Sequence, residues 1–382
     1  MHVALLFAPL SALSLAPTAC APATRSAPGP AAPDTDPSGG GTDSADGTEP
    51  APQAGDLLLE GARLPGASTP TSLLLSEGRI VALDPERIES DVEVVDLSGR
   101  WLAPAFIDSH VHLAYLPEAP AMLDGGVVAA VDLAAPIDAL AEPLGAMQVR
   151  WAGPMVTAVG GYPTQSWGRD GYGTEVTTAD QAAAAVATLT ESGASVIKVP
   201  LGGSPGLTDA ALAAAVSAAH DRGLPVAAHA LDDASAARAA AFDVDVLAHL
   251  PTRPLSADTV AAWSGRAVVP TLAAFGGGAD TLANLSALHD AGARVLYGTD
   301  FGNTRTPGIQ AAELRAMRDA GLSSADILAA GTSTPAAFWG FDGLGALAVG
   351  ARASLLVLDA DPLSDPLSLA DPVQVWVDGV RR

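Results

Sequence analysis

Apolar, strand-like runs alternate with alanine-rich helical segments through the middle of this chain, from about residue 104 to residue 340. Three of the helical segments end alike, because Gly193, Gly223 and Gly292 each stand where a C′ capping glycine precedes a new apolar run. The pattern predicts eight strands, near residues 105–111, 127–133, 154–160, 194–199, 225–229, 244–249, 266–271 and 294–299. Eight β/α repeats over about 235 residues predict a (β/α)8 TIM barrel, in which the carboxyl ends of the strands converge on one site.

The two ends of the folded region have a different sequence pattern, in which glycines separate short strand-like runs. Such runs fill residues 56–102, and they return in 353–359 and 373–380. We therefore expect an α/β chain with two folded domains: a small β-sandwich built from both chain ends (55–103 and 344–382) and the barrel (104–343).

The first 20 residues resemble a bacterial lipoprotein signal peptide. Residues 3–16 are largely apolar and lead into Pro17-Thr18-Ala19-Cys20, a small-residue approach to a cysteine that would carry the lipid. No lysine or arginine precedes the apolar stretch and Pro17 stands where leucine is usual, so the coding start could lie upstream. An ordinary secretory signal in which Cys20 is incidental is the alternative. We expect an exported bacterial protein, periplasmic or on the cell envelope, that meets a membrane only through this anchor.

A tether is expected between the signal and the folded region. Residues 21–54 contain no Leu, Ile, Val or aromatic residue and are dominated by Ala, Pro, Gly, Ser, Thr and Asp. Such a segment buries too little apolar surface to offset the entropy of ordering it, so we predict a disordered linker.

The charge and cysteine content exclude two classes of protein. A formal net charge of -24 repels the phosphates of nucleic acids and of anionic lipids, so we expect no nucleic-acid partner. The single cysteine rules out an internal disulfide framework.

One lysine, Lys198, stands among 19 lysine and arginine residues. It lies in the apolar run 194–200, where an ammonium group is costly to bury unless its charge is removed or matched. Unlike arginine, a buried lysine loses its proton readily and then reacts as an amine. The position is therefore either a reactive amine or a lysine left by chance at a strand end.

Ionisable side chains end five of the predicted strands. His110 and His112 lie two residues apart on the first strand, so both point to the same side and can share a metal ion. The fourth, fifth, sixth and eighth strands end in Lys198, His229, His249 and Asp300. His220 and His289 fall instead at the C-termini of predicted helices, where a cation complements the helix dipole, and we assign both a structural role.

This order of strand-end residues resembles the amidohydrolase superfamily, in particular its binuclear members with a carboxylated bridging lysine. Residues 103–112 are similar to the family's first-strand motif, with Ala105 where glycine is usual. Residues 350–358 and 375–379 are similar to its closing β segment, so the similarity extends over nearly the whole chain after the tether. Within the superfamily, the layout most resembles the imidazolonepropionase-like and Xaa-Pro dipeptidase-like group.

The resemblance implies a metal centre that cleaves the C–N bond of a small amide or peptide. The implied ligands are His110, His112 and Asp300 for one divalent cation, His229 and His249 for a second, and Lys198, carboxylated on its amine by carbon dioxide, for both. Nitrogen and oxygen ligands suit Zn²⁺, and other divalent ions fit the same set. A water activated by both cations would attack the carbonyl, with Asp300 as general base and then as general acid towards the leaving amine.

The substrate is the least defined part of this interpretation. The bridging lysine favours a dipeptide such as Xaa-Pro, whose carboxylate needs a cationic or phenolic anchor from a loop above the barrel. Candidate anchors, which could equally be solvated surface positions, are Tyr162, Arg169, Tyr172, Arg253 and Arg305. Trp167 and the glycines 276–278 could shape or gate the pocket. A cyclic amidase or lactonase on the same centre is one alternative, and a non-catalytic surface-binding lipoprotein is another. The sequence does not indicate an oligomeric state.

Overall fold

A computed structural model describes residues 56–86 and 92–382 of this chain. The predicted signal (1–20) with Cys20 and the predicted tether (21–54) lie outside the described residues.

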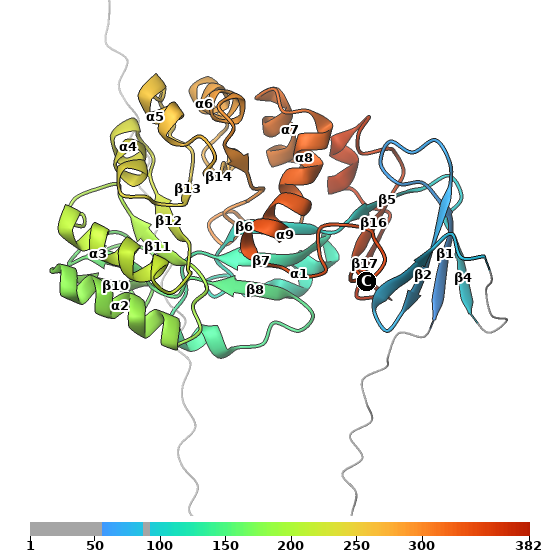
Figure 1. The fold of residues 1–382 in the computed structure, drawn as a ribbon, viewed down its shortest axis with the longest axis horizontal. Helices are drawn as coiled ribbons and strands as arrows, with labels where there is room; N and C mark the ends of the chain where they lie inside the picture. The colour runs from blue at the N-terminus through green and yellow to red at the C-terminus, as the bar shows by residue number, and fades with distance from the viewer. Residues whose placement is uncertain (1–55, 87–91) are drawn as a thin grey trace, which may run out of the picture. The chain divides into compact units, whose positions relative to one another are not determined.

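Each of the eight predicted barrel strands overlaps an observed strand, and seven of them contain it whole (Figure 1). Their pairings are parallel, which is the arrangement of a (β/α)8 barrel. The predicted barrel is thereby confirmed. In chain order the strands are β6 (Phe106–Val111), β7 (Val127–Asp132), β9 (Met155–Ala158), β11 (Ile197–Pro200), β12 (Val226–His229), β13 (Val246–Ala248), β14 (Ala267–Val269) and β15 (Arg294–Val295).

Two short strands go beyond the prediction. β8 (Gln148–Trp151) pairs with β7, and β10 (Gly173–Val176) pairs with β9, both in parallel. Each mixes polar with apolar side chains, so neither carries the uninterrupted apolar run that marks a buried parallel strand. Pairing with a neighbouring strand, more than local sequence, determines their conformation.

Backbone hydrogen bonds at both edges join the strands into a ring. At one edge Ser109 N donates to Tyr297 O at 2.8 Å, which ties β6 to the segment after β15. At another, Ser195 N donates to Trp151 O at 2.9 Å, which ties β8 to the start of β11. The first of these contacts brings the beginning and the end of the barrel together, and with them the first and last candidate ligands.

Side chains alternate between two apolar clusters along the barrel strands. Val246 and Ala248 belong to one buried cluster, whereas Leu247 between them belongs to another. The same alternation places Ala267 and Val269 with the first cluster. Because successive residues of a strand point to opposite sides, one cluster fills the barrel interior and the other packs under the helices.

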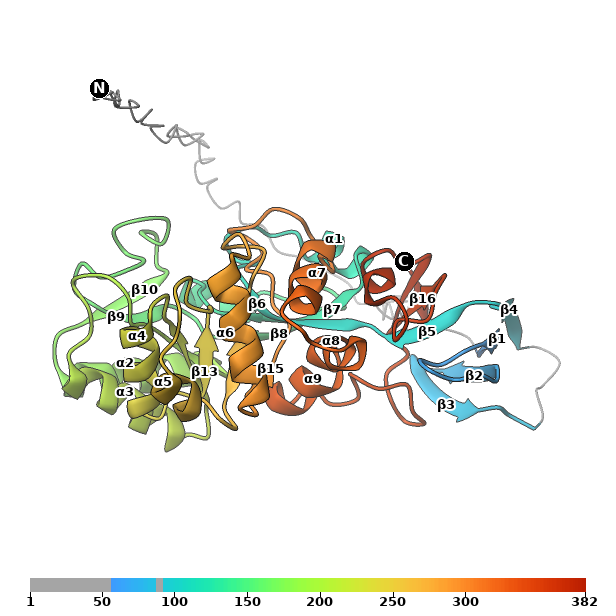
Figure 2. The same cartoon turned by 90° about the horizontal axis from the view of Figure 1, so that it is seen from above.

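Helices surround the barrel strands (Figures 1 and 2). They are α1 (Ala119–Asp124), α2 (Ala179–Glu191), α3 (Asp209–His220), α4 (Asp233–Ala241), α5 (Ala257–Ala262), α6 (Ala279–Asp290), α7 (Ala311–Asp319), α8 (Ser324–Gly331) and α9 (Ser333–Trp339), with 3-10 turns η1 (Ile137–Ala141) and η2 (Pro366–Ala370). The side chain before each of α2, α3, α4, α5 and α8 accepts a hydrogen bond from a backbone N–H three residues on, as N-caps do. None of the described helices has the length and apolarity to cross a membrane.

The predicted capping glycines end their helices as expected. Gly193, Gly223 and Gly292 have φ values of +99°, +70° and +87°. Glycine reaches this left-handed region without steric cost, so the chain turns directly from each helix into the next strand.

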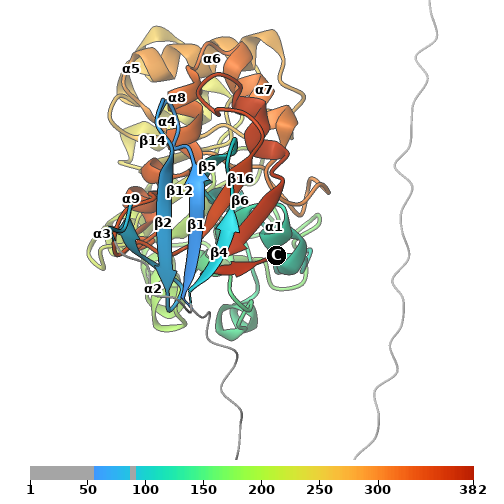
Figure 3. The same ribbon diagram turned by 90° about the vertical axis from the view of Figure 1, so that its right-hand side faces the viewer.

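The two chain ends form two small sheets. One has the order β3-β2-β1-β4, and the other, β18-β17-β16-β5, joins residues from both ends of the chain. Their strands are β1 (Leu57–Ala62), β2 (Thr71–Ser76), β3 (Arg79–Leu83), β4 (Glu93–Asp96), β5 (Trp101–Pro104), β16 (Leu355–Leu358), β17 (Gln374–Val377) and β18 (Val380–Arg381). Leu59 and Leu73 of the first sheet share a buried cluster with Leu355 and Trp376 of the second. Figure 3 shows β1 and β2 of the first sheet next to β5 and β16 of the second. The domain limits given above stay a prediction.

Candidate metal centre

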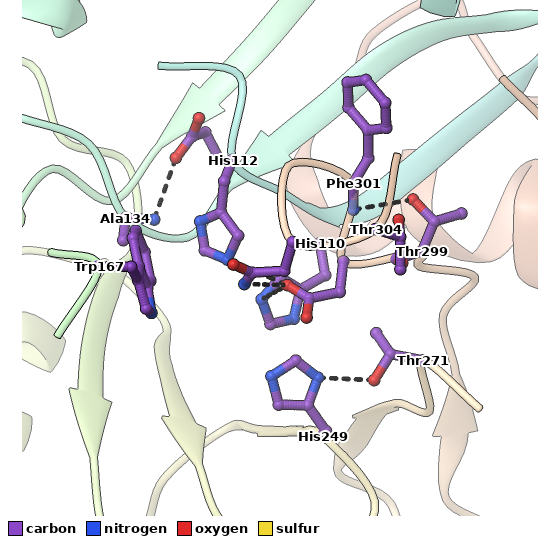
Figure 4. A network of polar contacts seen from close by, with 12 residues as sticks. His110, His112, Ala134, Trp167, His249, Thr271, Thr299, Phe301 and Thr304 are labelled. Carbon is purple, nitrogen blue, oxygen red and sulfur yellow. Dashed lines mark hydrogen bonds and ion pairs between the residues drawn. The ribbon is translucent and has the colours of Figure 1, made fainter. Parts of the chain in front are cut away.

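The six predicted ligands converge at the carboxyl ends of the barrel strands. Five of them are buried, with at most 4% of their surface exposed, and His229 is half-buried. His110 lies in β6 and Lys198 in β11, whereas the others follow or end their strands. Figure 4 shows the imidazoles of His110, His112 and His249 facing one space.

Distances between side-chain atoms fit ligands of shared cations. Asp300 Oδ1 lies 3.1 Å from His112 Nε2 and 3.5 Å from His110 Nε2. One ligand atom each from His110, His249 and Asp300 lies within 4.8 Å of the other two. The rings of His249 and His229 are 5.1 Å apart, which extends the cluster to the second predicted pair.

Three buried polar atoms of this cluster have no hydrogen-bond partner among the described residues: His110 Nδ1, His112 Nδ1 and Lys198 Nζ. Buried polar atoms are normally paired, so a group of unpaired ones calls for a ligand or an ion. A set of imidazoles, one carboxylate and one amine fits divalent cations such as Zn²⁺.

Three of the four histidines, His110, His229 and His249, are held neutral by burial, which leaves a lone pair for a metal. Burial lowers the pKa of His110 well below its usual value. Burial also lowers the pKa of His249 well below that value, and the pKa of His229 to about 3. Neutral imidazole is the form of histidine that binds metals.

Thr271 sets the orientation of His249 and was not a predicted residue. Its hydroxyl donates to Pro270 O at 2.8 Å and lies 2.6 Å from His249 Nδ1 (Figure 4). Because the hydroxyl proton is already used, Thr271 Oγ1 accepts from the Nδ1–H of His249. The lone pair of His249 is therefore on Nε2. Thr271 is the last residue of the seventh predicted strand (266–271), so its strand-end position was the available signal.

Lys198 has the properties of a neutral amine. The side chain is fully buried, and burial lowers the pKa of Lys198 to about 7, although the nearby Asp300 acts in the opposite direction. At neutral pH, Lys198 is therefore uncharged in a large fraction of the molecules. An uncharged amine is the form that combines with carbon dioxide.

Asp300 stays ionised in spite of its burial. Burial raises its pKa, but the hydrogen bond with His112 and the nearby His249 outweigh that effect and bring the pKa of Asp300 to about 2. Asn303 Nδ2 also donates to Asp300 Oδ1 at 3.1 Å. Asp300 has a φ of +54°, in the left-handed region that few residues with a side chain adopt.

Asp108 is a second residue that the strand-end pattern missed as a site residue. Its Oδ1 accepts from His110 N at 3.0 Å and from Thr299 N at 3.1 Å. Burial raises the pKa of Asp108 to about 7, while the hydroxyl of Thr299 acts in the opposite direction. Asp108 thus links the backbone beside His110 to the backbone beside Asp300. Its position within the first-strand motif was the available signal.

A cavity of about 380 Å³ opens above the cluster, and we call it the substrate cavity. Its lining residues are Tyr162, Trp167, His229, Leu231, His249, Ala274, Phe275, Asp300, Asn303 and Thr304. Trp167 was expected to shape the pocket, and it does line this cavity. The glycines 276–278 follow the lining residue Phe275 in the loop between β14 and α6.

One of the five predicted substrate anchors lines the substrate cavity. Tyr162 does, with its ring stacked 4.8 Å from the ring of His229. Arg169 is exposed and donates to Gln165 O at 3.3 Å, and Arg305 is exposed with its guanidinium 5.7 Å from the Tyr115 ring.

The other two anchors also lie outside the cavity lining. Arg253 is exposed, and Tyr172 is buried beside Trp167, with ring centroids 5.2 Å apart. The loops after the strands turn these side chains to solvent or into aromatic packing. The four residues beyond Tyr162 are outside the lining of this cavity, and their contact with a substrate stays a prediction.

His220 and His289 lie away from the six ligands. Both are in the last turn of a helix, as expected, and each faces a carboxylate: His220 Nε2 is 2.9 Å from Asp245 Oδ2, and His289 Nε2 is 3.6 Å from Asp326 Oδ2.

Comparison with known proteins decides the family. A model described as "Amidohydrolase family" matches residues 101–382. The chain belongs to the amidohydrolase family. The resemblance inferred from the strand-end residues is thus confirmed.

Solved structures similar to this amidohydrolase share its fold. A Xaa-Pro dipeptidase with methionine bound in its active site aligns with a TM-score of 0.73 and 20% identity, over 86% of this chain and 100% of that chain. Molinate hydrolase aligns with a TM-score of 0.69 and 18% identity, over 86% of this chain and 95% of that chain.

Similarity to curated relatives is local. An imidazolonepropionase of Chromobacterium violaceum is 46% identical over 55 residues, which are 13% of each chain. A dihydroorotase of Carboxydothermus hydrogenoformans is 50% identical over 40 residues, which are 10% of this chain and 9% of that protein. The matched segment thus spans a small part of the length of either relative.

Proposed function

We propose that this amidohydrolase is a metal-dependent hydrolase that cleaves an amide-type C–N bond of a small substrate. The observation that carries the proposal is the convergence of four histidines, Asp300 and an unpartnered buried lysine beneath the substrate cavity. Membership of the amidohydrolase family supports the same reaction class.

Six residues would hold two divalent cations, with zinc the best match to the donor atoms. Their proposed assignment is His110, His112 and Asp300 to the first cation, His229 and His249 to the second, and Lys198, carboxylated by carbon dioxide, to both. When bound, such a pair of cations lowers the pKa of a water to about 7 and polarises a carbonyl.

The protein's own groups position and move protons. Asp300 is ionised, so its carboxylate can accept a proton from the attacking water and deliver it to the departing amine. Thr271 keeps the Nε2 lone pair of His249 available. Trp167 and Phe275 cover the imidazoles of His112 and His249, with ring centroids 5.0 and 4.6 Å apart, and limit access of bulk water.

The role of Lys198 is tested by chemical rescue. Lys198→Ala should lose metal and turnover, and short carboxylic acids should restore both, because a free carboxylate can replace the carbamate oxygen atoms. Metal content and hydrolysis are measured together, with Lys198→Arg as the control that the acids cannot rescue. A Lys198→Ala variant with two metals per chain and full activity would contradict the proposal.

The reaction type is tested with a substrate panel. Xaa-Pro and other dipeptides, cyclic ureides and lactones, each assayed with the metal-loaded protein, separate a peptidase from a cyclic amidase or a lactonase. Less than about one metal per chain, with no turnover of any compound, would instead favour a binding protein, because the two-cation centre needs both ions.

We also propose that the protein is exported and anchored by lipid at Cys20. Support comes from the apolar residues 3–16 and the small residues before Cys20. Incorporation of radiolabelled palmitate by the native sequence and not by Cys20→Ser is the expected result. Labelling that persists in Cys20→Ser would contradict it.

A further inference from the structure

The walls of the substrate cavity are aromatic and aliphatic. Beyond the proposed metal ligands, its lining includes Tyr162, Trp167, Leu231, Ala274 and Phe275. Among the described residues that line the cavity none is a lysine or an arginine, and Asp300 is the one carboxylate.

The polar groups in these walls are largely occupied. Trp167 Nε1 donates to Tyr162 Oη at 2.8 Å, and the hydroxyl of Thr304 donates to Thr299 O at 3.1 Å. The Tyr162 hydroxyl proton and the second amide N–H of Asn303 are left to meet a substrate. Away from the proposed cations, neutral donors of this kind return less than the desolvation of a carboxylate costs, so the walls would accommodate an anionic group poorly.

The net charge of the whole chain also disfavours anionic substrates. A formal net charge of -24 lowers the local concentration of anions and slows their approach. In a dipeptide, the free carboxylate is separated from the scissile nitrogen by a single carbon atom. When the scissile carbonyl of the dipeptide faces the histidines, this carboxylate would therefore face the apolar walls.

From these observations we infer that the substrate cavity selects an uncharged substrate, a small amide with apolar or aromatic groups beside the scissile bond. The inference rests on the proposed function and narrows its substrate class. A carboxylate-bearing dipeptide is accordingly a poorer substrate than the same compound with a carboxamide in place of the carboxylate.

Matched compounds test the inference. N-Acetylproline is compared with N-acetylprolinamide, and 4-acetamidobenzoate with 4-acetamidobenzamide, on the zinc-loaded protein, and cleavage of the acetyl C–N bond is followed. Each pair differs in charge and hardly in shape. We expect kcat/KM to favour the carboxamide by at least about tenfold, which corresponds to about 1.4 kcal/mol. Equal values, or a preference for the carboxylate, overturn the inference while the proposed function stands.

Absence of turnover would have a separate meaning. If no compound is hydrolysed although two metals are bound, the proposed function fails. The dissociation constants of the same pairs, measured by calorimetry, then decide the inference: tighter binding of the carboxamide supports it, and equal or weaker binding overturns it.

Engineered charge provides a second, independent test. Leu231→Arg places a cation in the cavity wall and should shift the preference towards the carboxylate, whereas Leu231→Gln, of similar size and neutral, should keep the preference for the carboxamide. Ala274→Arg with Ala274→Gln repeats the comparison from the loop between β14 and α6 if the first variant does not fold. An unchanged preference in a folded arginine variant overturns the inference.

Discussion

His249 Nδ1 lies 2.6 Å from Thr271 Oγ1, a contact between residues 22 positions apart that fixes which nitrogen of His249 faces the cluster. A ligand histidine whose second nitrogen is held in this way binds metal more tightly, because its tautomer and ring orientation are already set.

Replacement of Thr271 should therefore weaken the metal centre. Thr271→Val keeps the shape and removes the acceptor, and we expect metal affinity to fall by about 10- to 100-fold. Thr271→Ser retains the hydroxyl and serves as the control. Competition with a chelator measures both variants, and equal affinities for Val and Ser would contradict this role.

Asp300 should be required for turnover. Asp300→Asn removes the proton acceptor, and we expect kcat to fall by about 10²- to 10⁴-fold in protein whose metal content has been measured. The exposed Asp221, changed to Asn, is the matched control and should retain activity. Normal turnover of fully metallated Asp300→Asn would rule out the proposed proton transfer.

Glu313 in α7 should make stability depend on pH. It is fully buried and accepts from Leu272 N at 2.9 Å and Ala273 N at 2.7 Å, beside the loop that lines the cavity. Burial raises the pKa of Glu313 from 4.5 to about 8, against the effect of these hydrogen bonds. Between those pH values the folded protein holds a proton that the unfolded chain has lost, so this residue makes the free energy of unfolding fall as pH rises.

Urea unfolding at pH 5 and pH 8 measures this effect. Glu313→Gln should lose part of the decrease in stability between the two pH values. The exposed Glu191, changed to Gln, should leave the decrease as it is. An identical decrease in the native protein and Glu313→Gln would show that Glu313 does not titrate in this range.

Gly331 should resist substitution although it ends a helix, where alanine is normally favourable. A Cβ at this position would lie 2.2 Å from Cε2 of the buried Phe106, whose ring packs edge-on against Tyr297. Overpacking of this kind costs about 1–3 kcal/mol, more than the helix preference of alanine returns. Thermal unfolding should give Gly331→Ala a Tm well below that of the native protein. Gly202→Ala, with nothing within 4 Å, is the control and should change little.

The substrate anchors show where sequence reasoning stops. Tyr162 lines the cavity, whereas Arg305 follows the eighth strand in sequence and yet lies exposed against Tyr115. A loop's place in the chain determines which end of the barrel it reaches, but the direction of its side chains depends on what the loop packs against.

By itself the sequence determined the barrel and the order of the residues that end its strands, because the periodicities of strands and helices are local patterns. In a (β/α)8 barrel the carboxyl ends of all strands lie at one face, so His110, Lys198 and Asp300 had to lie at that face. Only the tertiary structure decided how these residues are supported. Asp108 contacts Thr299 across 191 positions of the chain, and Thr271 orients His249 from the next strand. Such contacts depend on the closure and register of the ring, so no local pattern announces them.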